Sequence, residues 1–153
     1  MTIAEGLSVR DSKPGRALLA WRQWCRDGHP QGGLERMLRE GLLQVRSKEH
    51  AVSASMIVKT MRQLRFGHGL ERLASLASEK LQLLSELTFE RYLAERGNDD
   101  NADEVLTQVE FEQNQQRDLA TLKSIIALTG KLRDCDLFLR KSDGEDSPLL
   151  ELK

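Results

Sequence analysis

Three cationic side chains at helical spacing are the residues of this chain best suited to chemistry. Lys59, Arg62 and Arg65 stand at i, i+3 and i+6 within SASMIVKTMRQLRFGHG, residues 53–69. On a helix this spacing places all three on one face. The opposite, apolar face consists of Met56, Ile57, Met61 and Leu64. A fixed row of positive charge binds phosphate, so the pattern predicts a nucleic-acid contact, and a solvated face on an ordinary core helix is the alternative.

Polar residues beside this row would extend the contact. Ser53 and Ser55, together with Lys59, lie near the expected helix start, where base edges are usually contacted, and a serine oxygen there also caps a helix. In the connector 46–52, Arg46 and Lys48 would meet phosphates. The expected nucleic-acid site therefore consists of Arg46, Lys48, Ser53, Ser55, Lys59, Arg62 and Arg65.

Recognisable catalytic and metal-binding patterns are absent from the sequence. His29, His50 and His68 are isolated, with no HExxH and no Cys/His ligand spacing, so we expect no metal and no cofactor. Cys25 and Cys135 form no CxxC pair and are expected to be two buried thiols. Neither a GxGxxG nor a GxxxxGK[ST] phosphate loop occurs. We expect a binding protein rather than an enzyme, although a cysteine nucleophile with a distant histidine stays open.

Charge is divided along the chain. Residues 1–72 hold 13 Lys or Arg against 7 Asp or Glu, a net of +6, whereas residues 73–153 hold 10 against 17, a net of −7. The total is the formal net charge of −1. A basic half and an acidic half indicate different roles for the two parts.

The composition favours an all-α fold. Aromatic residues make up only 5% of the chain, three prolines occur, and unbranched side chains that lose little freedom in a helix are abundant. Three short amphipathic helices are expected at about 15–27, 34–45 and 53–66. They would form a small helix-turn-helix-like cluster, although the connector 46–52 is longer than the usual turn of roughly three or four residues. Residues 1–68 are then a basic helical nucleic-acid-binding region.

The remainder predicts a long antiparallel helical hairpin over residues 69–141. Its helices are expected at 70–97 and at about 102–140, with Asn101 and Glu104 in the layout of a capping box. The first helix is apolar on two faces, so one face should pack on its own chain and the other on a partner. The residues expected at an oligomer contact are Leu76, Leu83, Leu87, Leu122 and Ile126, with an intramolecular core as the alternative for about half of them.

The last residues, 142–153, are expected to form a flexible acidic tail. Leu149, Leu150 and Leu152 stand among its acids and would serve as a short motif for a larger protein partner, unless the tail is simply disordered. No run approaches the roughly 20 apolar residues of a membrane span, and the N-terminus lacks the apolar run of a secretory signal. We therefore expect no membrane contact and a cytoplasmic location, in a bacterium or an infected host cell.

This order of parts resembles the phage terminase small subunit. The DNA-binding part is carried by GGLERMLREGLLQV with SASMIVKTMRQLRF. The hairpin is carried by LERLASLASEKLQLLSELTFERYLAE with DEVLTQVEFEQNQQRDLATLKSIIALTGKLRD. The resemblance covers most of the chain and implies viral DNA recognition, hairpins packed side by side into a ring, and a tail that contacts the large subunit. The long connector 46–52 and Gly130 within the second hairpin helix depart from the family pattern.

Two other classes of protein stay open. One is a dimeric helix-turn-helix transcriptional regulator that uses the same basic cluster. The other is a helical adaptor, or small subunit of a larger complex, without direct DNA contact. Salt-dependent DNA binding would separate the adaptor from the other two, because contact with several phosphates makes affinity fall steeply with salt. Subunit number would separate a ring from a dimer.

Overall fold

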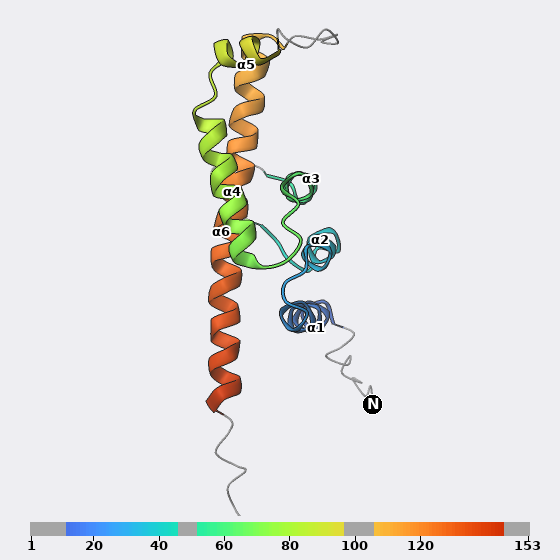
Figure 1. Cartoon of the computed structure of the whole chain (residues 1–153). Helices are drawn as coiled ribbons and strands as arrows, with labels where there is room; N and C mark the ends of the chain where they lie inside the picture. Colours follow the sequence, from blue (N-terminus) through green and yellow to red (C-terminus); the bar gives the residue numbers. More distant parts are fainter. Residues whose placement is uncertain (1–11, 46–51, 97–105, 146–153) are drawn as a thin grey trace, which may run out of the picture.

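The computed structural model describes residues 12–45, 52–96 and 106–145, apart from the side chains of Arg96 and residues 138–145. Within these ranges the chain is all-α, as predicted, and contains no β-strand. The helices are α1 (Lys13–Arg26), α2 (Gln31–Arg39), α3 (Ala54–Leu64), α4 (Leu70–Ser85), α5 (Phe89–Arg96) and α6 (Gln108–Glu145). Figure 1 shows α1, α2 and α3 stacked beside a long hairpin of α4 and α6.

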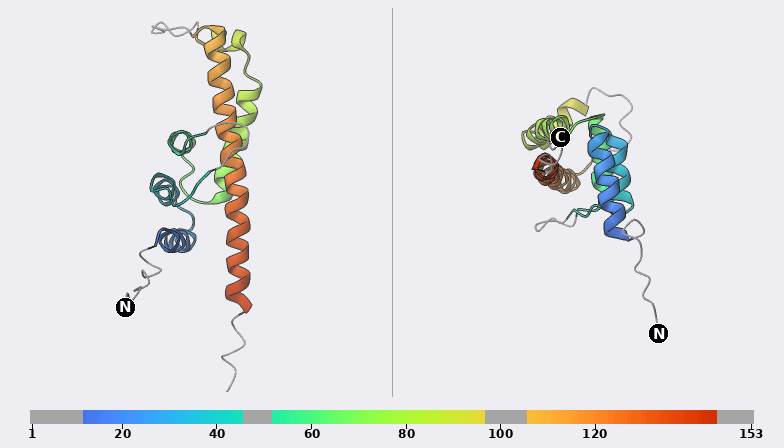
Figure 2. Two further views of the ribbon diagram at one scale, coloured as in Figure 1. Left: turned by 180° about the vertical axis from the view of Figure 1, so that it is seen from behind. Right: turned by 90° about the horizontal axis from the view of Figure 1, so that it is seen from below.

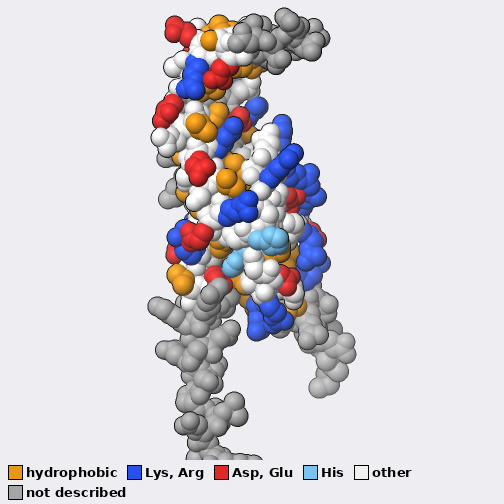
Figure 3. Space-filling view, in the orientation of Figure 1, with side chains coloured by type: hydrophobic (Ala, Val, Ile, Leu, Met, Phe, Trp, Pro, Cys, Tyr) orange, Lys and Arg blue, Asp and Glu red, His pale blue; other side chains and the backbone are white. Residues whose placement is uncertain are grey.

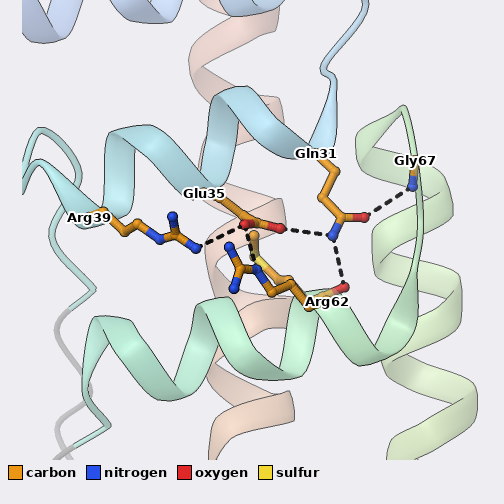
Figure 4. A network of polar contacts seen from close by, with 6 residues as sticks. Gln31, Glu35, Arg39, Arg62 and Gly67 are labelled. Atoms are coloured by element: carbon orange, nitrogen blue, oxygen red, sulfur yellow. Dashed lines mark hydrogen bonds and ion pairs between the residues drawn. The ribbon is translucent and has the colours of Figure 1, made fainter.

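The three short helices form one layer that lies across the hairpin. In Figure 1 the short helices are seen end-on and the hairpin lengthwise. In the view from below in Figure 2 the hairpin is seen end-on and the short helices lengthwise. Helices α2 and α3 lie side by side and run in opposite directions (Figure 4). The connection between them, residues 40–53, is much longer than the turn of roughly three or four residues in a compact helix-turn-helix.

Glycines in the left-handed conformation end two of these helices. At the end of α1 the N–H of His29 donates to the carbonyl of Trp24 at 2.9 Å, and Gly28 follows the helix with φ +76°. Gly41, with φ +64°, does the same for α2, which ends at Arg39; of the two ends that the sequence allowed, near residue 45 or at Gly41, the structure has the earlier one. Glycine adopts this conformation at little cost because it lacks a Cβ.

One hydrophobic core joins the short helices to the hairpin. Its fully or nearly buried side chains are Trp21, Trp24, Leu34, Met37, Leu38, Ile57, Val58, Met61, Phe66, Leu70, Leu73, Ala77, Leu122, Ile125, Leu128 and Leu132. They come from α1, α2, α3, α4 and α6 and from the loop that follows α3. The basic region and the hairpin that the sequence distinguishes therefore share their interior.

The first hairpin helix ends earlier than expected because a side chain from α6 caps it. The amide of Gln115 donates to the carbonyls of Leu84 and Leu87, at 2.6 and 2.7 Å. These carbonyls belong to the last turn of α4 and the bend after it, where an α-helix leaves its acceptors unpaired. Thr88 then starts α5 by accepting the N–H of Arg91 at 3.3 Å. The single helix expected over 70–97 is therefore two.

Helix α6 begins with a capping box. The N–H and hydroxyl of Thr107 donate to the carboxylate of Glu110 at 2.9 and 2.8 Å, and the N–H of Glu110 donates back to the Thr107 hydroxyl at 3.3 Å. The bonds from the Thr107 backbone and side chain lower the pKa of Glu110. The expected start near residue 102 was wrong, and the box expected at Asn101 and Glu104 lies outside the described residues.

The C-terminal end of α6 extends into the segment expected to be a tail. Residues 142–145 are helical, whereas Leu149, Leu150 and Leu152 lie outside the described residues. In the described ranges no helix combines the length and the apolar character that a membrane crossing requires.

Two glycines should respond to alanine in opposite directions. Gly130 lies inside α6, and a Cβ there would meet nothing within 4 Å, so Gly130→Ala should stabilise the fold by about 0.5–1 kcal/mol. A Cβ on Gly33 would lie 2.6 Å from Cδ1 of the buried Trp24, so Gly33→Ala should destabilise it by about 1–3 kcal/mol. Urea unfolding of both variants measures this. A destabilising Gly130→Ala would show that α6 is not a regular helix at that point.

Candidate nucleic-acid interface

A groove between α2 and α3 collects most of the predicted site. Its volume is about 1050 Å³, and it is lined by Leu38, Arg39, Ala54, Ser55, Val58, Lys59, Arg62, Gln63 and Arg65. Four of these nine side chains are Arg or Lys and none is acidic. Figure 3 shows Lys and Arg gathered on the side of the short-helix layer that faces away from the hairpin. We call this surface the basic groove.

Helix α3 holds its cations outward because its other side is in the core. Ile57, Val58 and Met61 are buried, whereas Lys59 and Arg62 are exposed. This confirms the predicted division between an apolar and a cationic face. Arg39 lies on α2 and was not predicted as part of the site. It meets the cations of α3 only through the packing of the two helices, which a long connector separates in the sequence. Its place in the last turn of a short amphipathic helix was the only signal.

A buried carboxylate beneath the basic groove engages two of its arginines. Oε2 of Glu35 lies 2.9 Å from Nε of Arg62 and 3.4 Å from Nη2 of Arg39 (Figure 4). The Glu35 side chain is only 11% exposed, while that of Arg62 is 56% exposed. A carboxylate so far removed from water needs charged partners and hydrogen bonds, so part of the Arg62 charge serves the fold.

Gln31 completes this network and links it to the loop after α3. Its amide nitrogen donates to Oε1 of Glu35 at 2.9 Å and, less closely, to the carbonyl of Met61 at 3.4 Å. Its amide oxygen accepts the N–H of Gly67 at 3.3 Å. Both oxygens of Glu35 therefore have donors, which orients the arginine side chains at the edge of the groove.

Lys59 and Arg65 are the cations that this network does not use. Neither forms an ion pair with any of the described residues. The backbone of Arg65 has φ +48°, in the left-handed region, and it is the residue that ends α3. A side chain raises the energy of that conformation, which glycine adopts freely. Arg65 therefore holds its place at a cost in stability.

The other predicted contact residues divide into two groups. Ser53 caps α3 by accepting the N–H of Met56 at 3.3 Å, and its Oγ lies 2.8 Å from that of Ser55. Both serines are exposed at the helix start, as expected. Arg46 and Lys48 lie outside the described residues.

The residues predicted for oligomerisation differ in their exposure. Leu83 on α4 is 63% exposed, and Leu76 and Leu87 are half-buried. Ile126 is half-buried against the core, and Leu122 is only 1% exposed. The assignment of Leu122 to a subunit contact was wrong, because its side chain is buried in the core of its own chain.

Comparison of the chain with protein-family models, with curated proteins and with solved structures finds no match. The resemblance to phage terminase small subunits therefore rests on the order of parts in the sequence. The geometry and charge of the basic groove carry the functional argument.

Two neighbouring cations on α3 should differ in what they contribute to folding. Arg62→Ala removes the closest partner of the buried Glu35 carboxylate, so it should lower the free energy of unfolding by about 1–3 kcal/mol. Lys59→Ala removes an exposed charge without a described partner and should change it by less than about 0.5 kcal/mol. Urea unfolding at neutral pH measures both. Equal effects of the two substitutions would contradict the assignment of Arg62 to the Glu35 network.

Proposed function

We propose that this chain is a non-enzymatic DNA-binding protein and that the basic groove is its phosphate contact. The observation that carries the proposal is the surplus of positive charge in the groove. Four cations from α2 and α3 converge there, and the adjoining Glu35 neutralises only one of them. Charge that the fold does not use is available to an external anion.

The arrangement of the cations suits a repeating anion. Lys59 and Arg62 lie one helical turn apart on α3, Arg65 follows at its end, and Arg39 approaches from α2. Several fixed charges that face one polyanion act together, because each phosphate they neutralise releases a counterion. The exposed hydroxyls of Ser53 and Ser55 at the start of α3 would add uncharged contacts to the same strand.

The strained Arg65 supports a role outside folding. Glycine is the residue that relieves strain at a left-handed position, yet this position carries a long cationic side chain that lines the groove. Strain that contributes nothing to the fold is most often found where a side chain serves binding. Arg65 therefore separates the two roles experimentally.

Oligomerisation and recruitment of a partner belong to the same proposal. The exposed Leu83 and the half-buried Leu76 on α4, with the half-buried Leu87 in the bend after it, offer an apolar surface for a second copy. The acidic segment 142–153 would contact a larger protein. With a ring of many subunits the protein would act as the terminase resemblance implies, by recognising viral DNA and recruiting a large subunit, whereas a dimer would indicate a transcriptional regulator.

The double substitution Lys59→Ala/Arg65→Gly should weaken DNA binding without weakening the fold. Neither side chain has an ion pair among the described residues, and glycine relieves the strain at residue 65. Loss of two phosphate contacts should reduce the slope of log affinity against log salt by about 1.8. Fluorescence anisotropy with a labelled duplex at several salt concentrations measures this slope, and urea unfolding checks stability.

The matched control is Lys123→Ala/Lys131→Ala, which removes two exposed cations from α6 and so lowers the net charge equally. It should leave both affinity and salt slope nearly unchanged. If both double variants lost the same DNA affinity, the effect would come from net charge alone and not from the basic groove. Wild-type protein that does not bind the duplex at low salt would overturn the proposal and leave the adaptor class. Binding that the groove variant leaves intact would move the contact elsewhere, for example to α1.

A further inference from the structure

Three side chains that commonly bind metals meet where the short helices touch α6. The donor atoms of Cys25, His29 and Asp136 all lie within 4.8 Å of one another. Cys25 belongs to α1, His29 follows that helix, and Asp136 is on α6. His29 is therefore not isolated from other potential ligand side chains, although its place in the sequence suggested that it was. The spacing of four between Cys25 and His29 was a weak signal, and Asp136 is too distant in the sequence to have been recognised.

His29 is held rigidly at this point. Its N–H donates to the carbonyl of Trp24 at 2.9 Å, and its carbonyl accepts the N–H of Gly69 at 3.1 Å. The imidazole stands edge-on to the Trp24 ring, with 4.6 Å between centroids and 77° between planes. Its backbone is in the left-handed region, with φ +59°. A ring fixed by its backbone and by an aromatic neighbour is ready to act as a ligand without reorganisation.

The nitrogen that faces Asp136 has no hydrogen-bond partner. Nε2 of His29 is buried, and the nearest carboxylate oxygen of Asp136 lies 3.9 Å away, too far for a hydrogen bond. The side chains of His29 and Asp136 are only 13% and 14% exposed. A buried polar atom without a partner costs about 1–3 kcal/mol, so such atoms call for a ligand, ion or water.

A nucleophilic cysteine triad does not fit this geometry. In such a triad the imidazole stands between the thiol and the carboxylate, with one ring nitrogen toward each. Here the Cys25 sulfur and an Asp136 oxygen are within 4.8 Å of each other, so no ring separates them. The three donors converge on a common point, which is the geometry of metal ligation.

We propose that Cys25, His29 and Asp136 bind one zinc ion. Thiolate, imidazole and carboxylate are the three ligand types that zinc takes in proteins, and its bond lengths imply donor separations of about 3.3–3.6 Å in a tetrahedron. The present separations, 3.9 Å for the His29–Asp136 pair and at most 4.8 Å within the set, close to these values by small side-chain rotations. Water would be the fourth ligand, because zinc is usually four-coordinate and the protein supplies three donors.

Bound zinc would fasten the end of α1 to α6. Helix α1 packs mainly against α2, and just after its end His29 lies 3.9 Å from Asp136 on α6. Because the ligands come from segments that meet only in the folded chain, zinc binding adds directly to stability. The ion would thus fix the short-helix layer, and with it the basic groove, on the hairpin.

Titration of the full-length chain with zinc chloride, followed by calorimetry, tests the proposal. We expect one zinc ion per chain and a higher unfolding temperature in its presence. Cys25→Ser and Asp136→Asn should each weaken the affinity by at least about tenfold. Cobalt in place of zinc should give the absorption of a thiolate–cobalt bond, and Cys25→Ser should abolish it.

The controls are Cys135→Ser and Asp134→Asn, which remove the same chemical groups from exposed positions on the same helix, α6. Both should bind zinc as the wild type does. Absence of binding to the wild type would overturn the proposal and leave His29 and Asp136 as an ion pair. Binding that survives both Cys25→Ser and Asp136→Asn, or that is lost equally in the controls, would also overturn it.

Discussion

Two backbone hydrogen bonds between the loop after α1 and the loop after α3 position the rest of the structure. The N–H of Gln31 donates to the carbonyl of Gly67 at 2.7 Å, and the N–H of Gly69 donates to the carbonyl of His29 at 3.1 Å. They pair the joint between α1 and α2 with the joint between α3 and α4. The pairing holds the start of α2 beside the start of α4, and with it the short-helix layer beside the hairpin whose core it shares.

Both proposed sites adjoin this pairing. On one side the Gln31 side chain reaches Glu35, and Glu35 takes up Arg62, so the remaining charge of the basic groove is left for an external anion. On the other side His29 is turned toward Asp136 on α6. The proposed DNA contact and the proposed zinc site are separate surfaces that depend on the same pair of loops. Distortion of these loops would affect both.

Local features of this fold could be predicted from the sequence, and contacts between distant segments could not. The two faces of α3, the Ser53 cap and the end of α1 at Gly28 depend on neighbouring residues. The early end of α4 depends on Gln115 from α6, and the burial of Leu122 depends on helices that the sequence places far away. For the site, the cations of α3 were recognised from their spacing. The buried Glu35 and the meeting of His29 with Asp136 arise only from packing.

Hydrogen–deuterium exchange with and without a DNA duplex, at low salt, tests the central claim most directly. The claim is that the α3 cations without an ion pair among the described residues, Lys59 and Arg65, contact the phosphates. We predict slower exchange in α3 and in the C-terminal turn of α2, because bound DNA covers the basic groove between them. Exchange in α4 should stay unchanged. Protection confined to α1 or to the hairpin, with α3 unaffected in a complex that does form, would contradict it.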